Sequence, residues 1–162
     1  MLIVGDGPLQ SVLEEKAHEL NLMGSCRFLG VRRDIPEILS ALDVLIMPSV
    51  SEGLPYVLLE ALAMGLPVVA SLVNGVEEII PDGEGGGYTI PSRSPERIVD
   101  ALMAIHQVPD EAKRRAERGR RRVRQVFDAS VSVRRWQDLY LQLRMDMSLQ
   151  GGHRPTKQCL YP

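Results

Sequence analysis

The chain alternates short apolar runs with longer segments of helical periodicity, and Gly or Pro marks most of the joins between them. Such alternation is typical of parallel sheets, because successive parallel strands need a long crossover that is usually a helix. The apolar runs lie at residues 2–4, 27–29, 44–47, 68–70 and 88–90. We therefore predict an α/β, Rossmann-like domain with a parallel sheet of about five strands and helices on both faces.

The segments between these runs carry apolar residues at the spacing of amphipathic helices. Helices are predicted after Pro8 and over residues 34–42, 55–64, 76–80, 95–106, 110–126 and 131–145. Asp34 and Glu37 have the spacing of a capping box, and Gly65 stands where a helix C-cap is expected. The uninterrupted apolar run at 44–47 predicts a buried strand.

The composition is that of an ordinary globular domain, with 44% hydrophobic and 25% charged residues among 162. No apolar run reaches the roughly 18 residues of a membrane helix, and no secretion signal is recognisable. The two cysteines, Cys26 and Cys159, have no metal-like spacing and suit a reducing compartment. We expect a cytoplasmic protein with one domain over residues 1–147 and a flexible tail over 148–162.

Acidic residues predominate in the first part of the sequence and basic residues in the last part. Residues 1–112 hold 17 acidic against 6 basic side chains, whereas residues 113–162 hold 4 against 13. Most of the positive charge lies in the segment 113–124. A basic segment of this kind can bind nucleic acid or an anionic membrane, or can be the solvated face of an amphipathic helix. We favour the helix and expect no nucleic-acid partner.

The loop at residues 48–55, Pro-Ser-Val-Ser-Glu-Gly-Leu-Pro, is the richest candidate for a binding site. It joins an apolar strand to a helix, and ligands of open α/β sheets collect at the carboxyl ends of strands. A helix start offers unpaired amides and partial positive charge to a phosphate, here through about Tyr56, Val57 and Leu58. Gly53 permits close approach, and Pro55 has no amide hydrogen.

Two glutamates flank this helix start. Glu52 precedes the helix and Glu60 lies inside it, and carboxylates accept hydrogen bonds from sugar or ribose hydroxyls. Glu60 is surrounded in sequence by apolar residues, where a buried carboxylate would need partners. The spacing alone is equally compatible with an ordinary loop acid and a solvent-facing helix acid.

The segment from Glu52 to Glu60, with seven residues between the acids, is followed by the sequence ALAMGLPVVA at residues 61–70. Together with Pro48-Ser49 it resembles the signature of the family-4 (group 1) retaining glycosyltransferases, which have the GT-B fold. The resemblance covers about residues 2–145 through further matches at residues 4–8, 28–30, 74–79, 82–83 and 136–140. It implies the C-terminal half of a GT-B enzyme, a hexosyltransferase that uses a UDP-, GDP- or ADP-sugar and an unknown acceptor.

The resemblance also implies roles for individual residues. The first glutamate of the family pair contacts the donor sugar and the second binds the ribose, so Glu52 is the catalytic candidate and Glu60 the ribose ligand. The turn at Gly5 and Gly7 is expected near the ligand, although Gln10 stands where a dinucleotide fingerprint needs a third glycine. The full donor-binding set is Glu52, Gly53, Leu54, Pro55, Tyr56, Val57, Leu58, Glu60, Gly5, Gly7 and, in the base wall at 27–31, Leu29.

The sequence indicates neither a metal nor a cofactor. His18, His106 and His153 are scattered, and no Asp-x-Asp pair is present to hold a metal. Ser49 and Ser51 have no nearby histidine to activate them, so nucleophilic catalysis is not expected. We expect metal-independent chemistry in which the nucleotide sugar is the substrate.

The resemblance implies that two parts of a GT-B enzyme are missing. One is the N-terminal acceptor domain, and the other is the first strand–helix unit of the C-terminal domain, where the family keeps an Arg and a Lys facing the donor phosphates. We expect the chain alone to have little or no transferase activity and weakened nucleotide binding, and to self-associate through an exposed strand edge.

Two alternatives stay open. One is a fragment of a nucleotide-sugar epimerase of the same fold. The other is a non-catalytic binding or scaffolding module that docks through the basic segment 113–124 on an anionic membrane or another subunit, which would make it membrane-peripheral.

Overall fold

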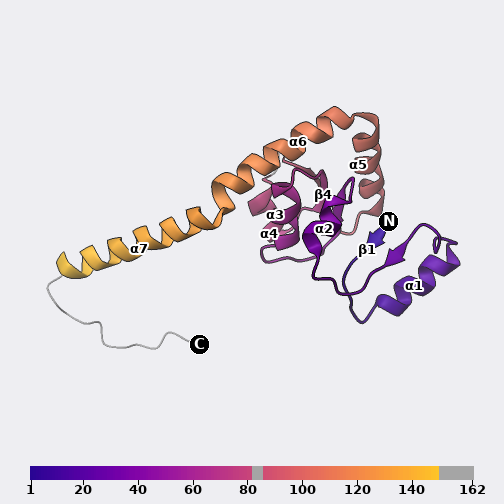
Figure 1. Ribbon diagram of the computed structural model, residues 1–162, viewed down its shortest axis with the longest axis horizontal. Coiled ribbons are helices and arrows are strands. Elements are labelled where there is room, and N and C mark those ends of the chain that lie inside the picture. Colours follow the sequence, from indigo (N-terminus) through magenta and orange to yellow (C-terminus); the bar gives the residue numbers. More distant parts are fainter. Residues whose placement is uncertain (82–85, 150–162) are drawn as a thin grey trace. The chain divides into compact units, whose positions relative to one another are not determined.

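A computed structural model describes residues 1–81 and 86–149 of the chain, with strands and helices in alternation (Figure 1). The elements are β1 (Leu2–Ile3), α1 (Gln10–Glu19), β2 (Arg27–Phe28), α2 (Ile35–Ser40), β3 (Leu45–Met47), α3 (Tyr56–Ala63), β4 (Val68–Ser71), α4 (Asn74–Ile79), β5 (Tyr88–Ile90), α5 (Pro95–Gln107), α6 (Pro109–Arg122), the π-helical turn η1 (Val123–Phe127) and α7 (Ala129–Leu149). The five predicted strands and the predicted helices are all present, and the α/β class is confirmed.

The strands form two parallel sheets. β1 pairs with β2 in one sheet, and the other has the order β3–β4–β5. The single sheet of about five strands is therefore seen only in part. The chain divides correspondingly into two compact units, which we call unit 1 (Met1–Leu42) and unit 2 (Asp43–Pro162). The domain boundary at residue 147 stays a prediction, and most of the expected tail lies outside the described residues, as does the turn at 82–83.

Unit 1 has few buried apolar side chains, and backbone hydrogen bonds connect its strands and loops. The Gly5 amide donates to the Gly30 carbonyl at 2.8 Å, and both glycines have positive φ, 114° and 61°, which a β-carbon would disfavour. Its buried apolar side chains are Ala17, Cys26 and Leu39. Two strands of two residues each cannot cover a helix, so many apolar side chains of α1 and its flanks are exposed.

The capping box predicted at the start of α2 does not form. Asp34 is the N-cap residue, but its carboxylate accepts two hydrogen bonds from the Arg32 guanidinium, at 2.9 and 2.6 Å, and none from a helix amide. Such bidentate, charge-assisted bonds are stronger than a bond from a neutral amide. The Arg32 guanidinium accordingly holds the pKa of the Asp34 carboxyl below its ordinary value.

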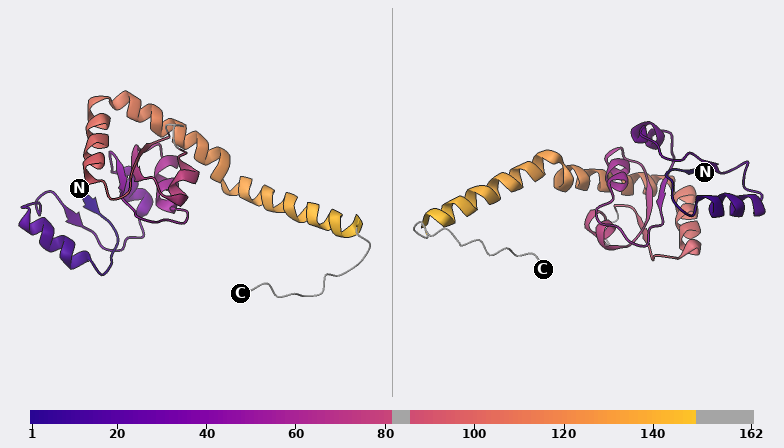
Figure 2. Two further views of the ribbon diagram at one scale, coloured as in Figure 1. Left: turned by 180° about the vertical axis from the view of Figure 1, so that it is seen from behind. Right: turned by 90° about the horizontal axis from the view of Figure 1, so that it is seen from below.

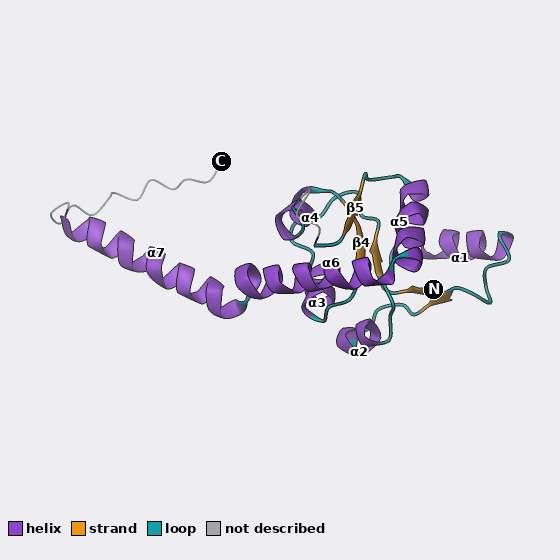
Figure 3. Ribbon diagram, turned by 90° about the horizontal axis from the view of Figure 1, so that it is seen from above, coloured by secondary structure: helices purple, strands orange, loops and turns teal. Residues whose placement is uncertain are grey.

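Strand β4 is the centre of unit 2, and all four of its residues are buried. Val69 packs with Ile90 and with Ala101 of α5, while α3 covers the opposite face of this sheet (Figure 3). The prediction that residues 44–47 form a buried strand is met only by Met47. The side chains of Leu45 and Ile46 are half-buried, because β3 lies at the edge of its sheet.

Helix α6 packs on the body of unit 2 through a stripe of small residues. Ala112, Ala116 and Gly119 are buried, and a β-carbon on Gly119 would lie 2.5 Å from the Gly86 carbonyl oxygen and 2.6 Å from Leu62. The absence of a side chain at this position lets α6 approach α3 and residue 86 closely.

The arginines of the basic segment are tied to the protein itself. Arg115 donates to the Gly87 carbonyl at 3.2 Å and lies 4.7 Å from the centre of the Tyr88 ring, and Arg122 donates to the Ile79 carbonyl at 3.0 Å. Salt bridges join Glu111 to Arg114, Arg115 and Arg118, and Glu117 to Arg120 and Arg121. This arrangement is that of an amphipathic helix within a domain, and contact with an anionic membrane stays a prediction.

Helix α7 follows η1 and makes little contact with the rest of unit 2 (Figure 2). Side chains from Ala129 to Asp146 are exposed, apart from the half-buried Val131, and the rings of Trp136 and Tyr140 lie 6.2 Å apart. Among the described residues, no helix combines the length and the apolar character needed to cross a bilayer.

The Gly119 packing predicts that Gly119→Ala destabilises unit 2. The added methyl group gains about 1 kcal/mol of helix propensity, but overpacking against a backbone oxygen, which cannot move aside as a flexible side chain can, costs about 2–3 kcal/mol. We expect a net loss of about 1–2 kcal/mol in the free energy of unfolding, measured by urea denaturation. Gly24→Ala, where no atom lies within 4 Å of the new methyl group, is the control. A Gly119→Ala protein as stable as the wild type would contradict this account.

Candidate functional site

The loop at 48–55 leads from the carboxyl end of β3 into the first turn of α3. Pro55 is the N-cap residue with φ −73° and ψ 104°, and no side chain caps the helix. The Pro55 carbonyl accepts the amides of Leu58 at 3.1 Å and Leu59 at 3.3 Å. The prediction of a free Leu58 amide is therefore wrong, because the first turn closes with a tight bond over three residues. The amides of Tyr56 and Val57 have no acceptor among residues 1–81 and 86–149.

Close backbone packing holds this loop against α4. A β-carbon on Gly75 would lie 1.7 Å from the Gly53 carbonyl oxygen and 3.2 Å from the Leu54 nitrogen. Only glycine permits this approach, so the start of α4 fixes the path of the loop beside the free amides. Sequence reasoning missed this role of Gly75, because the helix predicted over residues 76–80 begins after it, whereas α4 includes Gly75 in its first turn.

Glu52 is half-buried and is held from its own loop. The Ser49 hydroxyl donates to Glu52 Oε1 at 2.6 Å. The Ser92 hydroxyl, in the loop after β5, donates to the Ser49 carbonyl at 3.4 Å. Ser92 was missed by sequence reasoning because it lies 43 positions after Ser49 in the chain.

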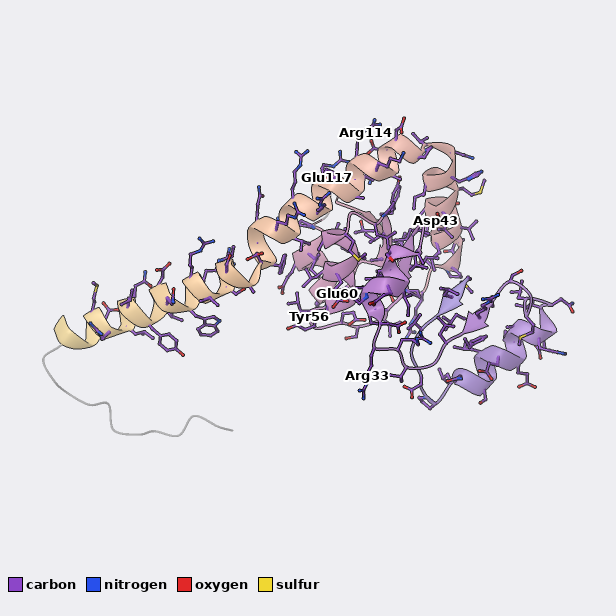
Figure 4. All side chains as sticks on the ribbon, viewed as in Figure 1. Arg33, Asp43, Tyr56, Glu60, Arg114 and Glu117 are labelled. Carbon is purple, nitrogen blue, oxygen red and sulfur yellow. The ribbon has the colours of Figure 1, made fainter. Side chains whose placement is uncertain are left out.

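Glu60 is exposed on α3, so the burial cost considered from the sequence does not arise. It lies one turn after Tyr56, whose side chain is 73% exposed, and both side chains lie on the same side of the helix (Figure 4). In the part of the chain that the structure describes, the Glu60 carboxylate has no hydrogen-bond or ion-pair partner. It is therefore available to a ligand.

The remaining predicted donor-binding residues differ in what they can offer. Gly53 and Leu54 are exposed, Val57 is half-buried, and Pro55 and Leu58 are buried, so the last two belong to the packing under the loop. In unit 1, Gly5 and Gly7 follow β1, and Leu29 follows β2 with its amide bonded to the Ile3 carbonyl at 2.9 Å. The structure thus brings the predicted residues together within each unit.

No group of three or more His, Cys, Asp or Glu side chains that could hold a metal ion occurs among the described residues. The expectation of metal-independent, cofactor-free chemistry stays a prediction.

The fold is that of an α/β protein with parallel strands. The loop after β3 brings two free helix amides and two carboxylates, groups that are chemically suited to a phosphorylated, hydroxyl-rich molecule. The family described as glycosyl transferases group 1 matches residues 1–107. The chain belongs to this family.

Two relatives show the extent of the similarity. The Escherichia coli UDP-Gal:alpha-D-GlcNAc-diphosphoundecaprenol alpha-1,3-galactosyltransferase is 37% identical over 105 residues, which are 64% of this chain and 27% of that protein. The Bacillus anthracis N-acetyl-alpha-D-glucosaminyl L-malate synthase is 30% identical over 148 residues, which are 90% of this chain and 38% of that protein. The chain therefore spans well under half the length of these relatives.

Solved structures share the fold. Sucrose-phosphate synthase from Thermosynechococcus elongatus matches with a TM-score of 0.78 and 28% identity, over 90% of this chain and 38% of that chain. Anabaena HepE, solved in complex with UDP, matches with a TM-score of 0.78 and 23% identity, over 86% of this chain and 40% of that chain. The GT-B assignment and the resemblance stated from the sequence are confirmed.

The contact between Gly75 and Gly53 predicts that Gly75→Ala displaces the loop. A methyl group cannot fit 1.7 Å from a carbonyl oxygen, so the backbone must move, at a cost of about 2–3 kcal/mol in the free energy of unfolding. Urea denaturation gives the stability, and amide NMR spectra should show shifts centred on residues 52–57. The exposed neighbour Asn74→Ala is the matched control. Unchanged loop amides in Gly75→Ala would refute the role given to this contact.

Proposed function

We propose that this chain is the donor-binding part of a retaining glycosyltransferase that moves a sugar from a nucleotide diphosphate sugar to an acceptor. The observation that carries the proposal is the first turn of α3, where the free amides of Tyr56 and Val57 lie between Glu52 and Glu60 in sequence. A site for an anion lies between two carboxylates that can accept hydrogen bonds from hydroxyls. This order matches the order of groups in such a donor, which is sugar, diphosphate and ribose.

In this proposal the diphosphate binds to the free amides of Tyr56 and Val57. The start of α3 carries partial positive charge, and its two unsatisfied N–H groups can donate to phosphate oxygens. Negative charge builds on the leaving diphosphate during sugar transfer, so donors already fixed in place stabilise the transition state more than the ground state. The packing of Gly53 on Gly75 is what fixes them.

The two carboxylates bind hydroxyls of the donor on either side of the diphosphate. Glu52 accepts from the transferred sugar and is the catalytic candidate, and the exposed Glu60 accepts from the ribose. Gly5, Gly7 and Leu29, all in unit 1, are the further candidates that the family resemblance gives for donor binding. No metal or cofactor is required in this scheme.

A uracil base is the first choice for the donor, because the name of the 37% identical Escherichia coli relative states UDP-Gal as its substrate. GDP- and ADP-sugars are the other candidates. We place the protein in the cytoplasm, where nucleotide sugars are used. A dedicated scaffolding role is less favoured, because the arginines of α6 bind carbonyls and carboxylates of unit 2 itself.

The proposal predicts binding of UDP that depends on Glu60. Glu60→Gln keeps the size of the side chain and removes its charge, so the Kd for UDP should rise by about tenfold, the loss of one charge-assisted hydrogen bond. Isothermal titration with UDP, GDP and ADP measures the effect and selects the base. Glu15→Gln, an exposed glutamate on α1, is the control. If the chain binds none of these nucleotides, or if Glu60→Gln binds UDP as the wild type does, the assignment is wrong.

A further inference from the structure

The hydrogen bonds around Glu52 give a role to a residue outside the predicted donor-binding set. Glu52 lies in a loop, where a glutamate side chain has several rotatable bonds and would lose much conformational freedom on binding a ligand. Here the carboxylate is already fixed, because the Ser49 hydroxyl donates to its Oε1 atom at 2.6 Å. That distance is typical of a strong O–H···O⁻ bond.

Ser49 is itself held by the fold. It follows Met47, the buried last residue of β3, and its carbonyl accepts the Ser92 hydroxyl at 3.4 Å. β3 and β5 are the two neighbours of β4, so this contact links the loops that leave both outer strands of the sheet. The Ser94 hydroxyl donates in turn to the Ser92 carbonyl at 3.4 Å. Between these serines Arg93 has φ 59°, a left-handed conformation in the same loop.

The bond also determines which acceptor sites of Glu52 remain. A carboxylate has about four lone-pair sites on its two oxygens, and Ser49 occupies one of them on Oε1. Oε2 has no partner among the described residues. The Glu52 carboxylate is therefore already oriented before a sugar hydroxyl binds, and its Oε2 atom is free to accept the hydrogen bond.

We propose that Ser49 is a positioning residue that orients the Glu52 carboxylate toward the hydroxyls of the donor sugar, and that Ser92 supports it from the β5–α5 loop. This inference rests on the proposed function. Ser49 acts through Glu52 and does not activate a nucleophile. Its effect is confined to the sugar end of the donor, since the free amides and Glu60 bind the diphosphate and ribose without it.

The test compares UDP with UDP-galactose, which share the uridine diphosphate and differ in the galactosyl group and in the charge of the terminal phosphate that it esterifies; the wild type and the variants are compared for each ligand separately. Isothermal titration of the full chain should give a Kd for UDP-galactose about tenfold higher in Ser49→Ala than in the wild type, as expected for loss of a hydrogen bond to a charged group. The Kd for UDP should not change. Ser49→Thr keeps a hydroxyl and should restore sugar binding, while Ser92→Ala should weaken it in the same direction and by less.

The matched control is Ser51→Ala, an exposed serine of the same loop that has no hydrogen-bond partner among the described residues. It should bind both ligands as the wild type does. Equal losses of UDP and UDP-galactose in Ser49→Ala would show a merely structural role and overturn the inference, as would wild-type binding of both. A wild-type chain that binds neither ligand would instead overturn the proposed function, and this inference with it.

Discussion

The burial of β4 is the constraint on which unit 2 depends. Its four residues are covered by helices on both faces of the sheet and are flanked by strands on both sides. Because the three strands are parallel, the loops that follow β3 and β5 lie at the same edge of the sheet. Ser49 and Ser92 meet there, and Gly75, shortly after β4, supports Gly53. The candidate site is therefore a set of loops anchored to one buried strand.

The local elements could be predicted from the sequence because their signals are local. Apolar runs and helical periodicity located the five strands and the α-helices of the described residues, and Gly65 has the positive φ, 77°, that its C-cap position requires. Pairing between strands has no such signal, so the division into two sheets was not foreseen. The capping box failed because Arg32, two residues away, competes for Asp34 with a stronger bond.

The candidate site was predictable in its position but not in its detail. The order of strand, loop and helix located the free amides, and the glutamate spacing supplied the acceptors. Whether Glu60 faces solvent depends on how α3 packs, which its mostly apolar sequence does not reveal. The partners of Glu52 depend on a serine three residues away and on a second one far along the chain, and only the folded loops bring them together.

The C-terminal end of helix α4 is held in part by a distant helix, and this links the motion of the site to that helix. The C-cap residue Ile80 donates its amide to the Val76 carbonyl, and Arg122 supplies donors to the carbonyls of Glu78 and Ile79, both at 3.0 Å. When α6 detaches, those carbonyls lose their donors, and α4 should open with it as one cooperative unit. Since Gly75, which supports the ligand loop, lies in the first turn of α4, local unfolding of α6 would also loosen the packing of that loop.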